Sequence, residues 1–314
     1  MMMDILDWES AKWLESVQKW TNQSLTEHGL EPIGKLERVS GWALGLILKQ
    51  KTNTGFYFFK STAFLPLFSN ESQVCSTLSK LMPEFVPEVL NVSKDNQWMI
   101  TNDFGGSLPE DTDKAIWANA FEFFANFQIK SINHLNALKL NGCLNRPIAN
   151  IPAQLNELLN NATITQCLPN EIEANKDDII LSVTKAIEAL EKFQIPNALV
   201  HGDLHIENIA ISNGKYLFFD WSDACISHPF IDGTYIFRMP EGEEKQNIIK
   251  AYLTQWVRLA DYETLLKAWH QAELVCYAHQ AITYGSMKKA LSEAQMQALE
   301  QAYINAFNRL ISTV

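Results

Sequence analysis

The stretch LVHGDLHIENIAISNGKYLFFDWSDACISHPF, residues 199–230, alternates short apolar runs with groups of polar residues. Its middle reads as an apolar run, a polar turn and an aromatic return strand, which together predict a β-hairpin. The Asn-Gly pair at 213–214 accepts the positive backbone angles that a tight hairpin turn needs. Because a hairpin folds its ends together, Asn208 and Asp220 should lie side by side, and Asp203 should face the same space.

These three polar side chains suit the transfer of a phosphoryl group. Such a transfer passes through a loose transition state, so the protein mainly positions groups and neutralises charge. Mg²⁺ prefers hard oxygen ligands and takes few of them from protein, and Asn208 and Asp220 can supply them. Asp203 is not needed as a ligand and can accept the proton of an attacking hydroxyl. The kinase catalytic loop has the same order of His-x-Asp, four residues, Asn, and an Asp after a short hairpin.

HGDLHIEN followed by FFDWSD resembles the aminoglycoside phosphotransferase family, within the protein-kinase-like fold. That family has HGDxxxxN where protein kinases have HRDxxxxN, and a D-W-x-D type segment where they have DFG. The resemblance implies that Asp203 is the base, that Asn208 and Asp220 bind the metal, and that His201 braces the loop. An Ile-Glu pair replaces the Pro-Gly often seen before the Asn, and it leaves these positions intact.

The composition is that of a globular protein, with 314 residues and 47% apolar side chains. No stretch approaches the roughly 18 uninterrupted apolar residues of a membrane helix, and the start MMMDILDWES lacks a signal pattern. The five cysteines are scattered without a CxxC pair, which favours reduced cysteines in the cytoplasm over disulfides or a zinc site. A net charge of −11 argues against a nucleic-acid partner. The sequence does not indicate an oligomeric state.

Short strands and turns dominate the first hundred residues, which indicates an antiparallel sheet. A helix is expected before them at 7–28, with apolar residues in helical phase at Trp13, Leu14, Val17 and Trp20. This tryptophan stripe is either a core face or a surface for a partner. Strands are expected at 33–39, 43–49, 55–60, 89–93 and 98–102.

Lys60 follows four aromatic residues and should not be buried without a partner. Glu71 is the natural one, in a helix expected at 69–81 with Ser69 or Asn70 as its N-cap. Taken separately, Lys60 reads as a solvated strand end, and Glu71 as a first-turn residue that the helix dipole favours. Beside the downstream motif, we interpret them as the kinase-type pair in which the lysine touches the α/β-phosphates of the nucleotide.

Three other positions are expected to meet the nucleotide, as the resemblance implies. Ser40 lies in a turn where a kinase-like fold places the loop over the phosphates, although a plain hairpin turn is equally consistent with the sequence. Residues 103–106 form a polar, glycine-containing hinge. Backbone groups around Ile100 and Asp103 would meet the adenine, and an ordinary strand-to-helix turn is the alternative.

Beyond the hinge the apolar period becomes helical. Helices are expected at 111–131, capped by Asp111 or Thr112, and at 171–193. The asparagine-rich segment 132–170 between them has short helical pieces, and its pattern does not determine its role; shaping an acceptor site is one role open to it.

Residues near the central motif are assigned supporting roles. Asp223 completes the D-W-S-D segment, and in similar proteins an acid here assists the metal or braces the loop; we expect bracing. Asp232 lies in a stretch that resembles the family's Asp-Pro…Asp, with His228 in the first place, and is expected to anchor the loop. His205 is either a contact for a ligand or a structural residue.

The sequence therefore predicts an α+β, bilobal protein-kinase-like fold. Residues 1–102 form a nucleotide-binding lobe with a small antiparallel sheet, residues 103–106 the hinge, and residues 107–314 a helical lobe with the catalytic loop and the acceptor site. The expected activity is Mg²⁺-dependent transfer of the γ-phosphoryl group of ATP or GTP to a hydroxyl of a small acceptor that can carry an amine.

Two alternatives remain. A non-catalytic nucleotide-binding or regulatory protein on the same fold is disfavoured because the base is retained. A protein kinase is disfavoured by HGD in place of HRD and by the lack of an APE segment.

Overall fold

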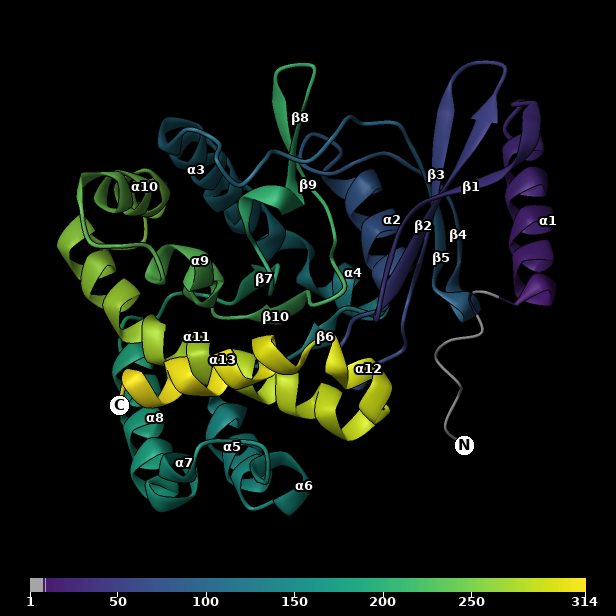
Figure 1. Ribbon diagram of the computed structural model, residues 1–314. Helices are drawn as coiled ribbons and strands as arrows, with labels where there is room; N and C mark the ends of the chain where they lie inside the picture. Colours follow the sequence, from purple (N-terminus) through teal and green to yellow (C-terminus); the bar gives the residue numbers. More distant parts are fainter. Residues whose placement is uncertain (1–7, 9) are drawn as a thin grey trace.

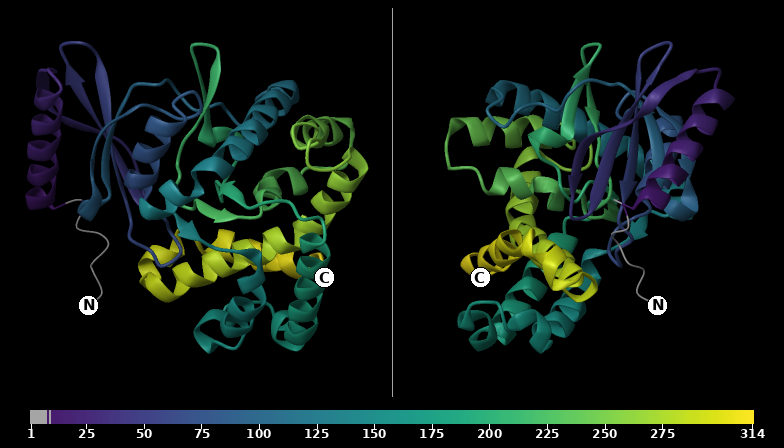
Figure 2. Two further views of the ribbon diagram at one scale, coloured as in Figure 1. Left: turned by 180° about the vertical axis from the view of Figure 1, so that it is seen from behind. Right: turned by 45° about the vertical axis from the view of Figure 1, so that its right-hand side comes forward.

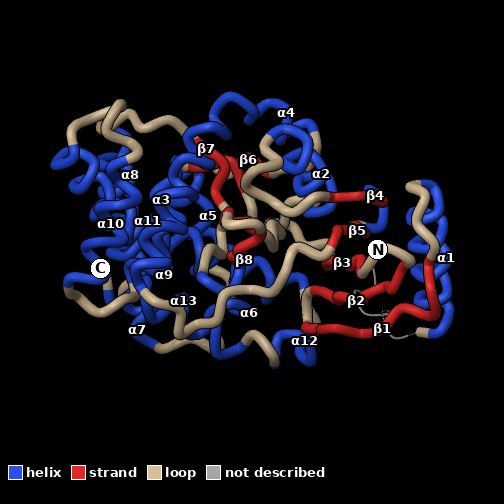
Figure 3. The backbone as a smooth tube through the Cα atoms, turned by 90° about the horizontal axis from the view of Figure 1, so that it is seen from above, coloured by secondary structure: helices blue, strands red, loops and turns tan. Residues whose placement is uncertain are grey.

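Five antiparallel strands form a sheet near the N-terminus, in the order β1-β2-β3-β5-β4 (Figure 1). The computed structural model describes residue 8 and residues 10–314. Figures 2 and 3 show this sheet to one side of a larger helical part, to which it is joined by loops. The antiparallel sheet and the helical remainder confirm the predicted α+β class. The strands are β1 (Pro32–Trp42), β2 (Gly45–Thr52), β3 (Phe56–Thr62), β4 (Val89–Ser93) and β5 (Trp98–Asn102).

Helix α1 (Ala11–Glu27) covers the outer face of the sheet. Trp13 and Trp20 meet the rings of Phe59 and Trp98 edge-on, with centroids 5.6–6.1 Å apart. The tryptophan stripe is therefore a core face, although Leu14 in the same stripe is 38% exposed. The expected start of this helix at residue 7 lies outside the described residues.

The first hairpin turns two residues later than the sequence predicted. Ser40 pairs with Ile47 and Trp42 with Gly45, so the turn is Ala43-Leu44 and the predicted loop of residues 40–42 is the end of β1. A Cβ on Gly45 would lie 2.3 Å from the Trp42 ring, so the bare glycine lets this large side chain lie across the end of the hairpin. The Trp42 ring thus packs closely on Gly45, and strand β1 continues through Gly41, which pairs with Leu46.

Two predicted helices have different ends in the structure. Helix α3 (Lys114–Ser131) is capped by Asp113, whose carboxylate accepts the N–H of Ala115, and the predicted caps Asp111 and Thr112 precede it. The predicted helix 171–193 is two helices, α7 (Asn170–Ala174) and α8 (Lys176–Glu191). Asn175 separates them, and its side chain donates to the carbonyl of Glu171, a local bond that competes with helix continuation.

A long helix, α11 (Tyr262–Ala290), forms the centre of the helical part and packs against α8, α13 and α5. A Cβ on Gly285 of α11 would lie 2.3 Å from Leu158 of α5, so this glycine allows close packing. None of the helices in the described residues combines the length and the apolar character needed to cross a membrane. The other elements are α2 (Glu71–Leu81), α4 (Leu135–Leu140), β6 (Leu144–Asn145), α5 (Ile151–Leu159), α6 (Ala162–Thr165), β7 (Ala198–Val200), β8 (Ile209–Ser212), β9 (Lys215–Phe218), β10 (Cys225–Ser227), η5 (Pro229–Gly233), α9 (Thr234–Phe237), α10 (Glu243–Thr254), α12 (Glu293–Gln297) and α13 (Glu300–Ser312), with further single turns of 3₁₀ helix.

Candidate active site

Lys60 of β3 connects three parts of the molecule. Its Nζ lies 2.7 Å from Oε1 of Glu71 and 2.7 Å from Oδ1 of Asp220. Glu71 is the first residue of α2, which Asn70 caps, and Asp220 follows strand β9. The lysine is 9% exposed, so it is not the solvated strand end that the sequence left open.

The buried carboxylate of Glu71 has two more partners besides Lys60. The hydroxyl of Thr62 donates to its second oxygen, and the N–H of Trp221 donates to Oε1 over 3.1 Å. Thr62 was not among the predicted residues, although it stands two residues after Lys60 and therefore on the same face of β3.

One ammonium thus faces two carboxylates at this point. Burial alone would lower the pKa of Lys60, but the carboxylates of Asp220 and Glu71 outweigh burial and raise it. Burial acts in the other direction on Asp220, and the Lys60 ammonium nevertheless holds the pKa of that carboxyl below its usual value. Lys60 and Asp220 are therefore both charged near neutral pH.

The turn of the predicted hairpin is confirmed. Strands β8 and β9 pair in antiparallel register, and Asn213 and Gly214 have φ angles of 50° and 75°. Across the hairpin the N–H of Phe219 donates to the carbonyl of Asn208, which brings Asn208 close to Asp220. The side-chain amide of Asn208 donates to the backbone carbonyl of Asp203 at 2.9 Å, so its amide oxygen stays free to bind a cation.

His201 and Asp232 hold the loop that carries Asp203. The ring Nε2 of His201 lies 2.9 Å from the carbonyl of Phe219, just before Asp220. Burial lowers the pKa of His201 to about 4, so the ring is neutral at pH 7 and Nε2 can donate to this carbonyl. The carboxylate of Asp232 accepts the N–H groups of His201 and Gly202, each over 2.8 Å. Burial raises the pKa of Asp232 to about 7, against the effect of these two donors.

Gly202 allows the loop to pass close to the D-W-S-D segment. Its φ is +87°, and a Cβ at this position would lie 2.5 Å from the carbonyl oxygen of Asp223. Burial, followed by the charges of Asp203 and Asp220, raises the pKa of Asp223 to about 8. The structure thus places three carboxyl groups of the motif together.

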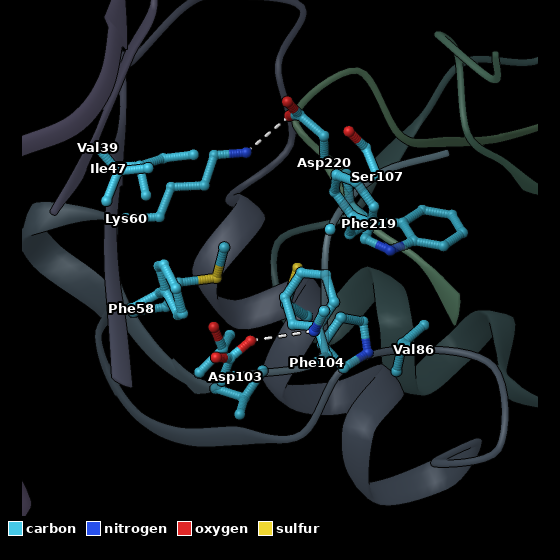
Figure 4. A pocket seen from close by; sticks show the side chains of 18 of the residues that line it. Val39, Ile47, Phe58, Lys60, Val86, Asp103, Phe104, Ser107, Phe219 and Asp220 are labelled. Atoms are coloured by element: carbon cyan, nitrogen blue, oxygen red, sulfur yellow. Dashed lines mark hydrogen bonds and ion pairs between the residues drawn. The ribbon is translucent and has the colours of Figure 1, made fainter. Parts of the chain in front are cut away.

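A cavity of about 610 Å³ opens beside Lys60 and Asp220 (Figure 4). Its apolar walls come from the inner face of the sheet, and Asp103, Phe104 and Gly105 line it as well. Three of the residues predicted for the nucleotide site do not line it, and of these Glu71 reaches it only through Lys60. Ser40 lies in β1 beside the lining residue Val39, and Ile100 alternates with the lining residues Met99 and Thr101, which places its side chain on the other face of the sheet.

A second cavity, of about 190 Å³, lies on the other side of Asp220. Asp203, Asp220 and Asp223 line it, whereas no residue of the segment 132–170 does. That segment folds into short helices, of which α5 packs under α11. Helix α11 and the N-terminal part of the chain contribute the other lining residues, among them Trp42, Phe68, Gln280, Tyr284 and Met287.

Comparisons with known proteins show which fold the chain shares. The chain resembles the solved structure of a Plasmodium vivax ethanolamine kinase, with a TM-score of 0.63 and 12% identity over 89% of this chain and 82% of that one. The complex of spectinomycin phosphotransferase APH(9)-Ia with ADP and spectinomycin gives a TM-score of 0.56 and 12% identity, covering 94% of each chain. The GDP and kanamycin complex of APH(2")-IIia gives 0.60 and 16%, covering 94% of this chain and 98% of that one.

These likenesses confirm the predicted protein-kinase-like fold. No curated protein matches the chain by sequence. The family model described as the phosphotransferase enzyme family, however, matches residues 105–269, which include the whole catalytic hairpin. The chain therefore belongs to the phosphotransferase enzyme family and is a phosphotransferase that acts on an alcohol group.

Proposed function

We propose that this protein transfers the γ-phosphoryl group of ATP or GTP to a hydroxyl of a small acceptor, with Mg²⁺ as its metal ion. The observation that carries the proposal is the position of Asp220. It lines both cavities and is bound to Lys60, while Asp203 stands in the wall of the smaller cavity. A phosphoryl group that passes Asp220 would move from the larger cavity toward a hydroxyl beside Asp203.

The size and lining of the larger cavity suit a nucleotide. Its volume lies in the range of small-molecule sites, and its walls are apolar apart from a few polar groups at the ends. Lys60, held in place by Glu71, would bind the phosphates at one end, and the hinge around Asp103 would meet the base at the other. The two related complexes contain ADP in one case and GDP in the other, so we include both nucleotides.

The donor atoms near Asp220 fit Mg²⁺. No group of three His, Cys, Asp or Glu side chains in the described residues could hold a metal by itself. Asn208 and Asp220 nevertheless offer two hard oxygens, and Mg²⁺ commonly binds one or two such groups together with water and phosphate oxygens. When bound, the metal would neutralise the phosphate charge that develops during the transfer.

The size and lining of the smaller cavity suit a small acceptor with a positive charge. Its volume equals that of about six water molecules, which is closer to the size of ethanolamine than to that of kanamycin. The carboxylates of Asp203 and Asp220 would attract an amine, and an amine beside Asp223 would favour the charged form of that carboxyl, while the aromatic and apolar lining residues would exclude water around it. Asp203 would take the proton of the acceptor hydroxyl.

Free cysteines and the use of a nucleotide favour a cytoplasmic enzyme.

The first test is thermal unfolding of wild type and Asp220→Asn with Mg·ATP and Mg·GTP. Ligand at about 100 times its Kd adds roughly 2.7 kcal/mol to the native state. We expect a metal-dependent stabilisation of the wild type that the variant lacks. ADP or GDP release should then be followed with ethanolamine, choline, spectinomycin and kanamycin as acceptors.

These results distinguish the proposed enzyme from a non-catalytic binding protein. Acceptor-dependent release in wild type and its loss in Asp203→Asn would support the proposal. Nucleotide binding without transfer of a phosphoryl group to these acceptors or to water would instead indicate a non-catalytic nucleotide-binding protein on the same fold.

A further inference from the structure

The carboxylate of Asp203 has fewer hydrogen-bond donors than those of Glu71 and Asp232. Glu71 accepts from three groups, and Asp232 accepts from two backbone N–H groups and from the amide of Gln128. The side chain of Asp203 is 43% exposed, and its one hydrogen-bond donor in the described part of the chain is the hydroxyl of Tyr235, 3.3 Å from Oδ1. Without this bond the side chain would be free to rotate.

Tyr235 is itself held in place by its neighbours. Its ring stacks on His205 with centroids 4.8 Å apart and planes inclined by 27°. The guanidinium of Arg238 lies 4.6 Å from the centre of the same ring. Tyr235 belongs to α9, which begins two residues after Asp232, so one short segment holds both the backbone of the catalytic loop and the carboxylate of Asp203.

The two carboxylate oxygens of Asp203 have different surroundings. Oδ1 accepts the Tyr235 hydroxyl, while Oδ2 has no hydrogen bond within the described residues and lies 3.8 Å from Nε2 of His205. A general base must point a lone pair at the acceptor hydroxyl at hydrogen-bond distance. A donor fixed on one oxygen sets the plane of the carboxylate and leaves the other oxygen for that hydroxyl.

We propose that Tyr235 is a positioning residue for phosphoryl transfer, which orients the Asp203 carboxylate through its hydroxyl while His205 stacks on its ring. This assignment rests on the proposed function, because it takes Asp203 as the base. Neither the match to the family model nor the predicted motif assigns a role to Tyr235.

The test is Tyr235→Phe, which removes the hydroxyl and keeps the ring. The matched control is Tyr277→Phe, because the Tyr277 hydroxyl also donates to a carboxylate, that of Glu273, over 3.3 Å, and lines neither of the two cavities. Phosphoryl transfer is measured with the acceptor among ethanolamine, choline, spectinomycin and kanamycin that wild type uses, or as Mg·ATP hydrolysis if it uses none. Mg·ATP binding is measured by equilibrium titration.

We expect Tyr235→Phe to lower kcat about tenfold, a part of the 10²–10⁴-fold effect of general base catalysis. KM for ATP and the affinity for Mg·ATP should stay within about twofold of wild type, because the interaction acts on the base and not on nucleotide binding. Tyr277→Phe should keep the wild-type kcat. His205→Ala should lower kcat in the same way, and the double variant should be less than additive because both residues act through Asp203.

Two results would overturn the assignment. A wild-type kcat in Tyr235→Phe, or a fall in kcat matched by the Tyr277→Phe control, would refute the positioning role while leaving the proposed function intact. A wild type that binds Mg·ATP but transfers no phosphoryl group to any acceptor or to water would remove the proposed function, and the role of Tyr235 with it.

Discussion

Replacing Lys60 with methionine tests how the centre of the site is stabilised. The substitution keeps an unbranched side chain of similar length and removes the ammonium that faces Glu71 and Asp220, each at 2.7 Å. Glu71 is 1% exposed and cannot be hydrated in the folded state, whereas the side chain of Asp220 is 30% exposed and can turn toward solvent. The cost should therefore fall mainly on Glu71.

Removing one partner of a buried ion pair costs about 3–5 kcal/mol. Because Asp220 is partly solvated and Glu71 keeps the hydrogen bonds from Thr62 and Trp221, we expect the lower end, about 3 kcal/mol at pH 7. Adding Glu71→Gln to this variant neutralises the buried charge and should restore about half of that loss.

The loss should also depend on pH. Burial already raises the pKa of Glu71 in the wild type, and the Lys60 ammonium opposes this rise. In Lys60→Met the cation is gone, so the folded-state pKa of Glu71 rises further above its unfolded value. The folded variant then keeps the proton over a wider pH range than the wild type does, and its free energy of unfolding falls relative to wild type as pH rises through that range.

Urea unfolding at pH 5 and pH 8 measures both effects. Lys130→Met is the matched control, because Lys130 and Glu84 are also 2.7 Å apart but their side chains are 54% and 35% exposed. We expect the control to cost less than about 1 kcal/mol at either pH. Equal losses for the two lysines, or a Lys60→Met deficit that does not grow between pH 5 and pH 8, would refute this account of the site.

Three further predictions concern the catalytic loop and its surroundings. Asp203→Asn should reduce turnover by about 10²–10⁴-fold and leave Mg·ATP binding near wild type, measured by steady-state kinetics and titration; surviving turnover would show that Asp203 is not the base. Gly202→Ala should destabilise the fold by at least about 1 kcal/mol in urea unfolding, because a Cβ would contact Asp223 at a φ of +87°; a neutral change would contradict this close packing. Burial lowers the pKa of His228 to about 3, so this one histidine should contribute about 1.4 kcal/mol per pH unit to the loss of wild-type stability as pH falls from 6 to 4. His228→Asn keeps a cap for the N–H of Phe230 and should show a correspondingly smaller slope; equal slopes would mean that His228 does not titrate in this way.

The catalytic hairpin could be predicted from sequence because its information is local. An Asn-Gly pair, two short strands and polar residues at both ends are enough to bring Asn208 and Asp220 together. The pair Lys60–Glu71 could also be predicted, since a buried lysine needs a carboxylate and only a short connection separates the strand from the helix.

Other features depend on contacts that no local pattern contains. Lys60 and Asp220 are 160 residues apart, and their ion pair exists only because the sheet packs on the hairpin. Tyr235 reaches Asp203 because Asp232 ties α9 to the catalytic loop, and nothing in the aromatic residue itself predicts this. The wall that α11 contributes to the smaller cavity depends in the same way on packing between distant parts of the chain.

The backbone of Asp220 has a consequence for attempts to stabilise this enzyme. Its φ is +66°, a conformation that a residue with a Cβ adopts at a cost of about 1 kcal/mol relative to glycine. Glycine at this position would relieve the backbone strain but would also remove the Lys60–Asp220 ion pair, so a library screened only for heat resistance reports which of the two effects is larger. Under the proposed function such a variant loses a metal ligand, so directed evolution of this chain needs a selection for turnover at every round.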